Sequence, residues 1–424
     1  MAMKSAKIAR EKNEMTPLVQ EIEGCARRAG LDPFHTLFQL CDYREMNEIA
    51  AFGGFPIRYS HWRFGMEFDI LLKGQTYGLQ RIYEIVINHD PCYAYLLECN
   101  NPVIQKTVIC HVFAHSDFFK QNRFFAHTRR DMIDRMAANA AKIRRFSDHY
   151  GTEVVEEFLD LSLSLENLID YQAVIPPRNA RDIEGKRTRD LMLFLIEQAQ
   201  DLEEWQRTLL EIVREEAYYF APQVQTKIIN EGWASFWHSQ LMNQFVLTDR
   251  EVIDYASQHS LAVAATPGQL NPYKLGIELF RDIEKRGIDL FEVRANCNDA
   301  AFIDSFLTEE FCREQKMFVY EFNRRSGGYE IVDRNWLLVK ETLLNQLTNA
   351  GQPFIYVQDD NFEGRGELLL VHDHHGLDLK LSDCHATLQN LYRVWKKPVH
   401  LMTVIANQPK MLSCSGNSKS EVAI

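Results

Sequence analysis

The chain has 424 residues, of which 46% are hydrophobic and 25% charged, the balance of a globular protein with a large buried core. At roughly 100–200 residues per domain, this length predicts two to three domains. Acidic residues outnumber basic ones by 59 to 47, and the formal net charge of −12 argues against nucleic acid or an anionic membrane as a bulk partner. No run of apolar residues reaches the ~18 that a membrane-spanning helix requires.

Cysteine usage and the amino terminus both bear on location. The nine cysteines are scattered without a CxxC pair, which favours reduced core thiols over a disulfide framework. Residues 1–15 are basic and polar, and no apolar stretch of the kind found in a secretory signal follows them. We therefore expect a cytoplasmic protein.

The first 100 residues change pattern twice. Up to about residue 50 the apolar residues show helical spacing, as at Leu37 and Leu40. Residues 51–78 are rich in aromatic residues and glycine without a clean period, which predicts an ordered loop region with short extended pieces. The short runs 83–88 and 93–98, separated by a proline-containing turn signal, predict a β-hairpin.

From residue 102 to residue 322 the sequence is dominated by helical patterns. Apolar residues recur every three to four positions, and the polar, proline-bearing segment 173–188 predicts an exposed loop. The helices expected from this spacing cover residues 103–119, 129–149, 153–168, 189–220, 226–247, 251–259 and 275–285.

After residues 326–328 shorter elements are expected, and the tail from Ser415 is expected to fray. The order of these elements predicts a small antiparallel sheet with two helices on one face. The fold class is thus α+β and mainly α, with a large helical domain over 1–325 and a small α+β domain over 330–414. The expected helices of this part cover residues 335–349 and 386–395, and the expected strands cover residues 353–357, 366–372, 398–405 and 410–414.

The sharpest chemical signal is a pair of histidines in a helical segment. His111 and His115 are four residues apart, so both imidazoles lie on one helix face and can bind one metal ion. This is the spacing of the HExxH zinc enzymes, in which the second residue is the glutamate that activates water. Here the second residue is Val112, so the usual base is absent from its usual place.

A carboxylate about 115 residues further on can complete a metal-binding set. Glu231 lies in the segment NEGWA, which resembles the NEGxA segment of gluzincin-type aminopeptidases, whose glutamate is the third zinc ligand. Two histidines and a carboxylate leave a fourth position for water. His238 competes for the third place, but seven helical residues put it about 10 Å along the axis from Glu231. We favour Glu231 as the ligand and His238 as a group behind the ligands or facing substrate, with a two-metal site as a third alternative.

A metal-dependent reaction also needs a general base. Glu84 and Glu98 stand in the two apolar runs before the histidine helix, where a carboxylate is out of place on a simple core strand. Zincin architectures set an edge strand across the active site, so either residue can face the metal there. The alternative for both is an ion pair with Arg81 or Arg123. Further candidates for the base are Asp117, Glu166 and Asp170.

The metal interpretation has a structural alternative. A helical HxxxH pair also arises when two histidines are hydrogen-bonded within a core, and Val108, Val112 and Phe119 on the same segment are apolar. Nucleotide-driven and serine-hydrolase chemistry are disfavoured, because the chain has no GxxxxGK[ST], no convincing GxGxxG and no GxSxG motif.

Nine segments in order along the chain resemble the SpoVR family, the stage V sporulation protein R group. They span almost the whole sequence, so the match is more specific than any one motif. They are RYSHWRFG (58–65), YGLQRIYEIVIN (77–88), PCYAYLLECN (91–100), HVFAHSDFFKQN (111–122), LSLENLID (163–170), NEGWASFWH (230–238), LNPYKLG (270–276), RGELLL (365–370) and LYRVWKKPVHL (391–401).

The resemblance implies a cytoplasmic bacterial protein linked to formation of the spore cortex or to stress response. It also implies partners, because members are commonly encoded beside a PrkA-type serine kinase and a von Willebrand-type protein. It transfers no reaction to His111, His115 or Glu231, whose assignment rests on spacing.

Two hypotheses follow, and whether the chain is an enzyme stays open between them. The first is a hydrolase of an amide bond in a peptide or cell-wall-derived substrate, using zinc or another divalent transition metal. The second is a non-catalytic regulator or adaptor in the kinase pathway, in which the same residues form a closed structural site.

Overall fold

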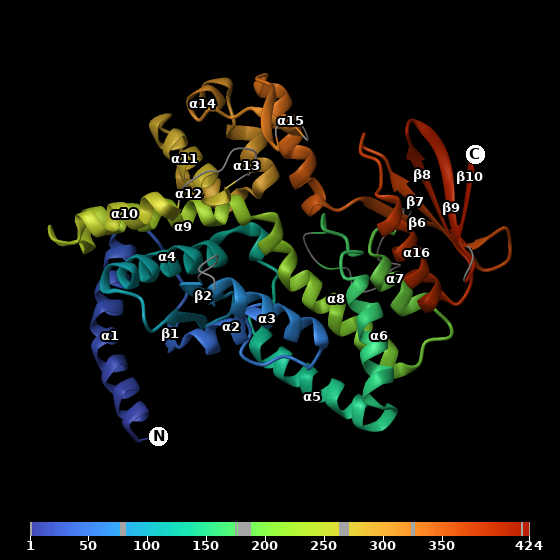
Figure 1. Ribbon diagram of the computed structural model, residues 1–424, viewed down its shortest axis with the longest axis horizontal. Helices are drawn as coiled ribbons and strands as arrows, with labels where there is room; N and C mark the ends of the chain where they lie inside the picture. Colours follow the sequence, from blue (N-terminus) through green and yellow to red (C-terminus); the bar gives the residue numbers. More distant parts are fainter. Residues whose placement is uncertain are drawn as a thin grey trace. The chain divides into compact units, whose positions relative to one another are not determined.

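The computed structural model describes residues 2–76, 82–173, 176, 188–262, 271–323, 327–416 and 419–423. In this part the chain forms sixteen α-helices and ten β-strands, which confirms the expected mainly helical α+β fold (Figure 1). None of the described helices is long and apolar enough to cross a membrane. By its internal contacts the chain divides into two compact units, each made of two stretches: the first unit is Met1–Ala138 with Gln223–Leu347, and the second is Asn139–Pro222 with Thr348–Ile424.

The first unit contains a three-stranded sheet in the order β1-β3-β2 (β1 Thr36–Cys41, β2 Glu84–Ile87, β3 Cys92–Leu97). The expected hairpin is confirmed, because β2 pairs antiparallel with β3. β1 pairs parallel with the other side of β3, which leaves β2 as an edge strand. In this register Glu84 lies opposite Leu96, a fully buried residue, so the side chain of Glu84 is on the face turned toward the core.

Three helices form the centre of the first unit: α4 (Pro102–Gln121), α9 (Lys227–Leu241) and α11 (Pro272–Lys285). α4 starts where the Asn101 side chain accepts a hydrogen bond from the Ile104 backbone, with proline at the first helical position. Its residues from Val108 to Phe119 are all buried, since α9 packs along one side of α4 and the sheet contacts another (Figure 1). α9 in turn packs on α11.

The remaining elements of the first unit surround this centre. They are α1 (Ala2–Arg28), α2 (Tyr43–Ala51), α3 (Trp62–Thr76), a 3-10 turn (Arg123–Phe125), a π-helical turn (Met242–Val246), α10 (Val252–Ala262), α12 (Leu290–Asn296), α13 (Asp299–Phe306), α14 (Glu309–Glu314), β4 (Val319–Asn323), β5 (Gly328–Asp333) and α15 (Trp336–Leu347).

Two predictions for the first unit were wrong. Residues 36–41 form strand β1 and not helix, because pairing with β3 decides the conformation of a short apolar run whose spacing fits either structure. Residues 62–76, expected as loop, form helix α3. α3 buries Phe64 but exposes apolar residues such as Met66 and Ile70, so its apolar residues follow no single face.

The second unit holds a five-stranded sheet in the order β10-β9-β8-β7-β6. Helix α16 packs on β8 and β9 through buried residues such as Leu388 and Leu391. The strands are β6 (Phe354–Phe362), β7 (Glu367–Asp373), β8 (Val399–Ile405), β9 (Gln408–Cys414) and β10 (Lys419–Ala423); the helices are α6 (Thr152–Ser164), α7 (Leu191–Gln198) and α16 (Leu381–Trp395), together with most of α5 (Met132–Tyr150) and of α8 (Glu204–Gln225).

The expected strands and the final helix of this unit are present. Three other features differ from the prediction. The sheet is antiparallel except that β7 and β8 are parallel, because the connection through α16 returns the chain in the same direction. The tail expected to fray contains β10, which pairs with β9. The single helix expected over 189–220 is two helices, because α7 ends at Gln198 and α8 starts at Glu204.

The compact units cut across the ranges 1–325 and 330–414 expected from the sequence. Residues 139–222 group with the C-terminal sheet, as when Arg393 of α16 donates a hydrogen bond to Glu157 of α6. The helix expected over 335–349 is present as α15, but it groups with the first unit. Most of the predicted loop 173–188 lies outside the described residues.

Candidate metal centre

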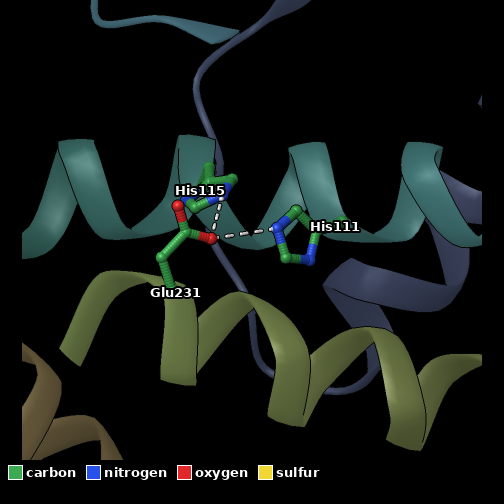
Figure 2. A group of neighbouring side chains, drawn as sticks. All are labelled: His111, His115 and Glu231. Atoms are coloured by element: carbon green, nitrogen blue, oxygen red, sulfur yellow. Dashed lines mark ion pairs between the residues drawn. The ribbon is translucent and has the colours of Figure 1, made fainter. Parts of the chain in front are cut away.

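Helices α4 and α9 face each other across three side chains that can bind a metal ion. His111 and His115 lie one turn apart on α4, and Glu231 reaches them from α9 (Figure 2). Glu231 Oε2 lies 3.4 Å from His111 Nε2 and 3.5 Å from His115 Nε2. The structure therefore brings together the three residues that the sequence singled out as candidate ligands.

The geometry of the cluster fits a divalent ion. Two ligand atoms that are each ~2.1 Å from a tetrahedral zinc ion lie roughly 3.4 Å apart, close to both nitrogen–oxygen distances here. All three ligand atoms lie within 4.8 Å of one another. In the described part of the chain this is the one group of His, Cys, Asp or Glu side chains gathered closely enough to hold a metal.

The outer nitrogens of both imidazoles are occupied by hydrogen-bond partners. His115 Nδ1 lies 2.9 Å from Asn230 Oδ1, and because an amide oxygen only accepts, His115 donates from Nδ1 and its Nε2 faces Glu231. Burial lowers the pKa of His115, but the neighbouring Glu231 carboxylate outweighs burial and raises it. His111 Nδ1 lies 3.0 Å from His238 Nδ1. His238 thus contacts the ring nitrogen of His111 that is not turned toward Glu231 and can orient this ring. It is not one of the three side chains gathered closely enough to hold one ion.

The carboxylate supplies the clearest test of fit. Glu231 Oε2 is buried and has no hydrogen-bond partner, although it is the oxygen that both Nε2 atoms face. Burial favours the neutral form of this carboxyl, but the two imidazoles outweigh burial and hold the pKa of Glu231 well below its usual range. A buried, charged oxygen that faces two imidazole nitrogens is a donor set that a cation can complete.

Of the five carboxylates considered as a base, the structure brings one, Glu84, to the cluster. Glu84 Oε1, on edge strand β2, lies 3.9 Å from His111 Nε2, and its side chain is 22% exposed. Burial raises the pKa of Glu84, and the charge of Glu231 adds to this effect while the imidazoles oppose it. Glu98 follows the last residue of β3 and is exposed, and its charge adds to the effects that raise the pKa of buried Cys41 to about 12.

The other carboxylates considered as a base lie elsewhere. Asp117 on α4 is buried and accepts hydrogen bonds from the Trp233 indole at 2.9 Å and from the Asp32 backbone at 2.8 Å. It therefore joins α4 to α9 and has a structural role. Glu166 and Asp170 belong to the second unit.

A tyrosine that sequence reasoning missed completes the surroundings. The ring of Tyr273, in the first turn of α11, stacks toward His111 with centroids 6.4 Å apart. Burial together with the charges of Glu231 and Glu84 raises the pKa of Tyr273, so its hydroxyl lies within the electrostatic reach of both carboxylates. The signal was the segment LNPYKLG, quoted for its resemblance only and not read for chemistry.

Close packing of α9 on α11 places Tyr273 at the cluster. A Cβ atom added to Gly232 would lie 2.5 Å from the Cα of Gly276, a separation that real Cβ atoms do not reach. Only a pair of glycines allows this approach. Gly232 is the neighbour of Glu231 and Gly276 is three residues from Tyr273, so the contact fixes both side chains relative to each other.

Comparison with known proteins identifies the family. The family model described as "SpoVR like protein" matches residues 9–188 and 172–352, and the model described as "SpoVR-like C-terminal domain" matches residues 353–406. The chain belongs to the SpoVR family. This confirms the resemblance found in the nine segments. The ligand helices α4 and α9 and the tyrosine of α11 all lie within the range of the first SpoVR model.

A curated relative of this SpoVR chain is "Uncharacterized protein YcgB" of Escherichia coli (strain K12). It is 27% identical over 453 aligned positions, which cover 88% of this chain and 89% of the relative. No solved structure matches the chain.

Proposed function

We propose that this SpoVR protein is a cytoplasmic, metal-dependent hydrolase that cleaves an amide bond in a peptide or cell-wall-derived substrate. One observation carries the proposal: the Nε2 atoms of His111 and His115 converge on a buried Glu231 oxygen without a hydrogen-bond partner. A second carboxylate, Glu84, stands 3.9 Å from one of these nitrogens. Spore cortex formation and stress response, which the family name and resemblance imply, are consistent settings for such a reaction.

When bound, zinc or another divalent ion would supply a Lewis acid and lower the pKa of water. His111, His115 and Glu231 would hold it through the atoms that now face one another. Glu84 is the group with the geometry of a base, because it approaches the ligands from the strand side and not from α4 or α9. It takes the place of the glutamate that Val112 replaces in the HxxxH segment.

Glu84 would accept a proton from the attacking water as the water oxygen bonds to the carbonyl carbon. The same carboxyl would then give this proton to the nitrogen of the breaking C–N bond. Two products, a carboxylic acid and an amine, account for every atom of the amide and the water. His238 and Asn230 would keep both imidazoles oriented throughout, by the hydrogen bonds at their Nδ1 atoms.

The proposal is tested by metal content, measured by inductively coupled plasma mass spectrometry on protein purified without a histidine tag and supplied with zinc. We expect about one ion per chain in the wild type and in His127→Ala, an exposed histidine of the first unit. The ion should be lost in His111→Ala and Glu231→Gln, with circular dichroism showing that both stay folded. A wild type that retains no metal contradicts the proposal.

A second candidate function is a regulator that acts with a PrkA-type serine kinase and a von Willebrand-type partner. The observation in its favour is also Glu84, whose carboxylate is close enough to His111 to serve as a fourth ligand and close the site, as in structural zinc sites. Glu84→Gln separates the two candidates, with Glu98→Gln as the matched control. Lower metal affinity in Glu84→Gln supports the closed site, and unchanged affinity with loss of cleavage in a panel of fluorogenic amides supports the hydrolase.

A further inference from the structure

Tyr273 differs from the other side chains around the metal cluster in its exposure. His111 and His115 are buried, whereas Tyr273 remains 37% exposed. Its ring nevertheless stacks toward His111, with centroids 6.4 Å apart, and the charge of Glu231 acts on its hydroxyl. Tyr273 therefore spans the distance between solvent and the ligand atoms, and a substrate that approaches on this side meets it first.

The position of Tyr273 is fixed by packing and by a helix cap. α11 starts at Pro272, and the Asn271 side chain accepts hydrogen bonds from the backbones of Tyr273 and Lys274. The Gly232–Gly276 contact holds this first turn against α9 at the residue next to Glu231. Placement of the hydroxyl therefore costs no further ordering of the chain when substrate binds.

The hydroxyl has one proton to donate and two acceptors that compete for it at different stages. Without a cation, the best acceptor is the charged Glu231 carboxylate. Once that charge is shared with a cation, the carboxylate becomes a weaker acceptor. An oxygen that gains negative charge beside the ion is then the stronger one.

We infer that Tyr273 donates a hydrogen bond to the carbonyl oxygen of the amide substrate and stabilises the negative charge that develops there during hydrolysis. The inference rests on the proposed function, and it goes beyond it by assigning a residue that touches the substrate. It also places the scissile carbonyl between Tyr273 and the ligand cluster, on the side of α11.

The experiment uses the full-length protein loaded with Co²⁺, whose visible spectrum reports its ligands, and acetohydroxamate as a probe that presents an amide-like oxygen. We expect Tyr273→Phe to bind Co²⁺ as the wild type does but to bind acetohydroxamate roughly 10- to 100-fold more weakly, the loss that follows removal of a hydrogen bond to a charged group. Tyr150→Phe, a change at a partly exposed tyrosine of the second unit, should leave both affinities unchanged. Tyr273→His, which restores a donor on the ring, should bind the probe more tightly than Tyr273→Phe.

The other outcomes overturn the inference in distinguishable ways. Equal acetohydroxamate affinity in wild type and Tyr273→Phe overturns it and leaves the proposed function in place. Weaker Co²⁺ binding in Tyr273→Phe makes the tyrosine a ligand and not a donor to substrate. A wild type that binds no Co²⁺ overturns the proposed function and this inference with it.

Discussion

The carboxylate of Glu231 has a position that a simple core would not tolerate. Its Oε2 atom is buried without a hydrogen-bond partner, and leaving such a group unpaired costs about 1–3 kcal/mol or more. Around it, His115 and His111 each have their outer nitrogen engaged and their inner nitrogen turned toward the same oxygen. Two imidazole nitrogens and one carboxylate oxygen thus converge on one point, as the ligands of a metal ion would.

The first prediction concerns Asn230, whose side chain accepts the hydrogen bond that orients His115. Asn230→Ala takes away the acceptor at Nδ1, so His115 can rotate or adopt the other tautomer. We expect zinc affinity to fall about 10- to 100-fold, measured by competition with a chromogenic chelator. Asn243→Ala removes an exposed asparagine beyond the same helix and is the control. Equal affinity in Asn230→Ala and the control would mean that the hydrogen bond does not orient a ligand.

Spacing predicted the two candidate histidine ligands because helical geometry is local, whereas Glu231 was found through the segment NEGWA. Four residues always place His111 and His115 on one face, whatever the rest of the chain does. The sequence could not decide between Glu84 and Glu98 as the base, because the decision depends on where β3 ends and on which face of β2 meets α4. Tyr273 was missed for the same reason, since its place is set by the contact between two helices far apart in sequence.

At the scale of elements, the second prediction concerns the close contact between α9 and α11, which leaves no room for a methyl group at Gly232. Gly232→Ala puts a Cβ atom 2.5 Å from the backbone of Gly276, so the helices must separate. We expect a loss of about 1–3 kcal/mol in the free energy of unfolding in urea, together with weaker zinc binding.

Gly65→Ala is the matched control for this change. Gly65 lies within helix α3, and an added Cβ atom meets nothing within 4 Å. The substitution should be neutral or stabilise the protein by up to about 1 kcal/mol, because alanine favours helix over glycine. If Gly232→Ala behaved like Gly65→Ala, the close helix contact would not exist in solution.

Most helices and strands could be predicted from periodicity, and the errors share a cause. In α4 and α16 the apolar spacing continues for several turns, which no strand can imitate. β1 has six residues and fits either structure, so only its partner β3 decides. In α3 some apolar residues pack toward α2 and others face solvent. Such a sequence lacks the one-sided apolar spacing by which a helix is predicted.

At the scale of the whole molecule, a bound ion is expected to stabilise only one of the two compact units. All three ligands of the candidate metal centre belong to the first unit. An ion that binds only the folded state stabilises it by about 2.7 kcal/mol at 100 times its Kd. The third prediction is therefore that zinc slows hydrogen exchange in α4 and α9 but not in β8 and α16, followed by mass spectrometry. In Glu231→Gln zinc should have no effect, and protection spread equally over both units would contradict a site confined to the first.

The second unit has an acid-sensitive group of its own. His372 on β7 is buried, and its Nδ1 lies 2.9 Å from the Thr403 hydroxyl on the neighbouring strand β8. Burial lowers the pKa of His372 to about 4, and the charge of nearby His374 acts in the same direction. The folded protein therefore holds this imidazole neutral at a pH where an unfolded chain, with a histidine pKa of about 6.5, takes up a proton.

The fourth prediction is that acid destabilises the second unit through His372. Below about pH 6.5 the unfolded state binds more protons, so the stability of the second unit falls with decreasing pH until about pH 4. The slope reaches about 1.4 kcal/mol for each pH unit only well below pH 6.5, so the loss between pH 6.5 and pH 5 is about 1.5 kcal/mol. Hydrogen exchange of β7 and β8 at both pH values measures it.

The matched variants are His372→Gln, which cannot titrate, and His375→Gln, which replaces an exposed histidine three residues away. His372→Gln should remove most of the pH dependence between pH 6.5 and pH 5, whereas His375→Gln should retain it. Because the neutral imidazole joins β7 to β8 across their parallel pairing, its protonation loosens the centre of the sheet and not an edge. An unchanged pH dependence in His372→Gln would assign the acid sensitivity to other groups of the unit.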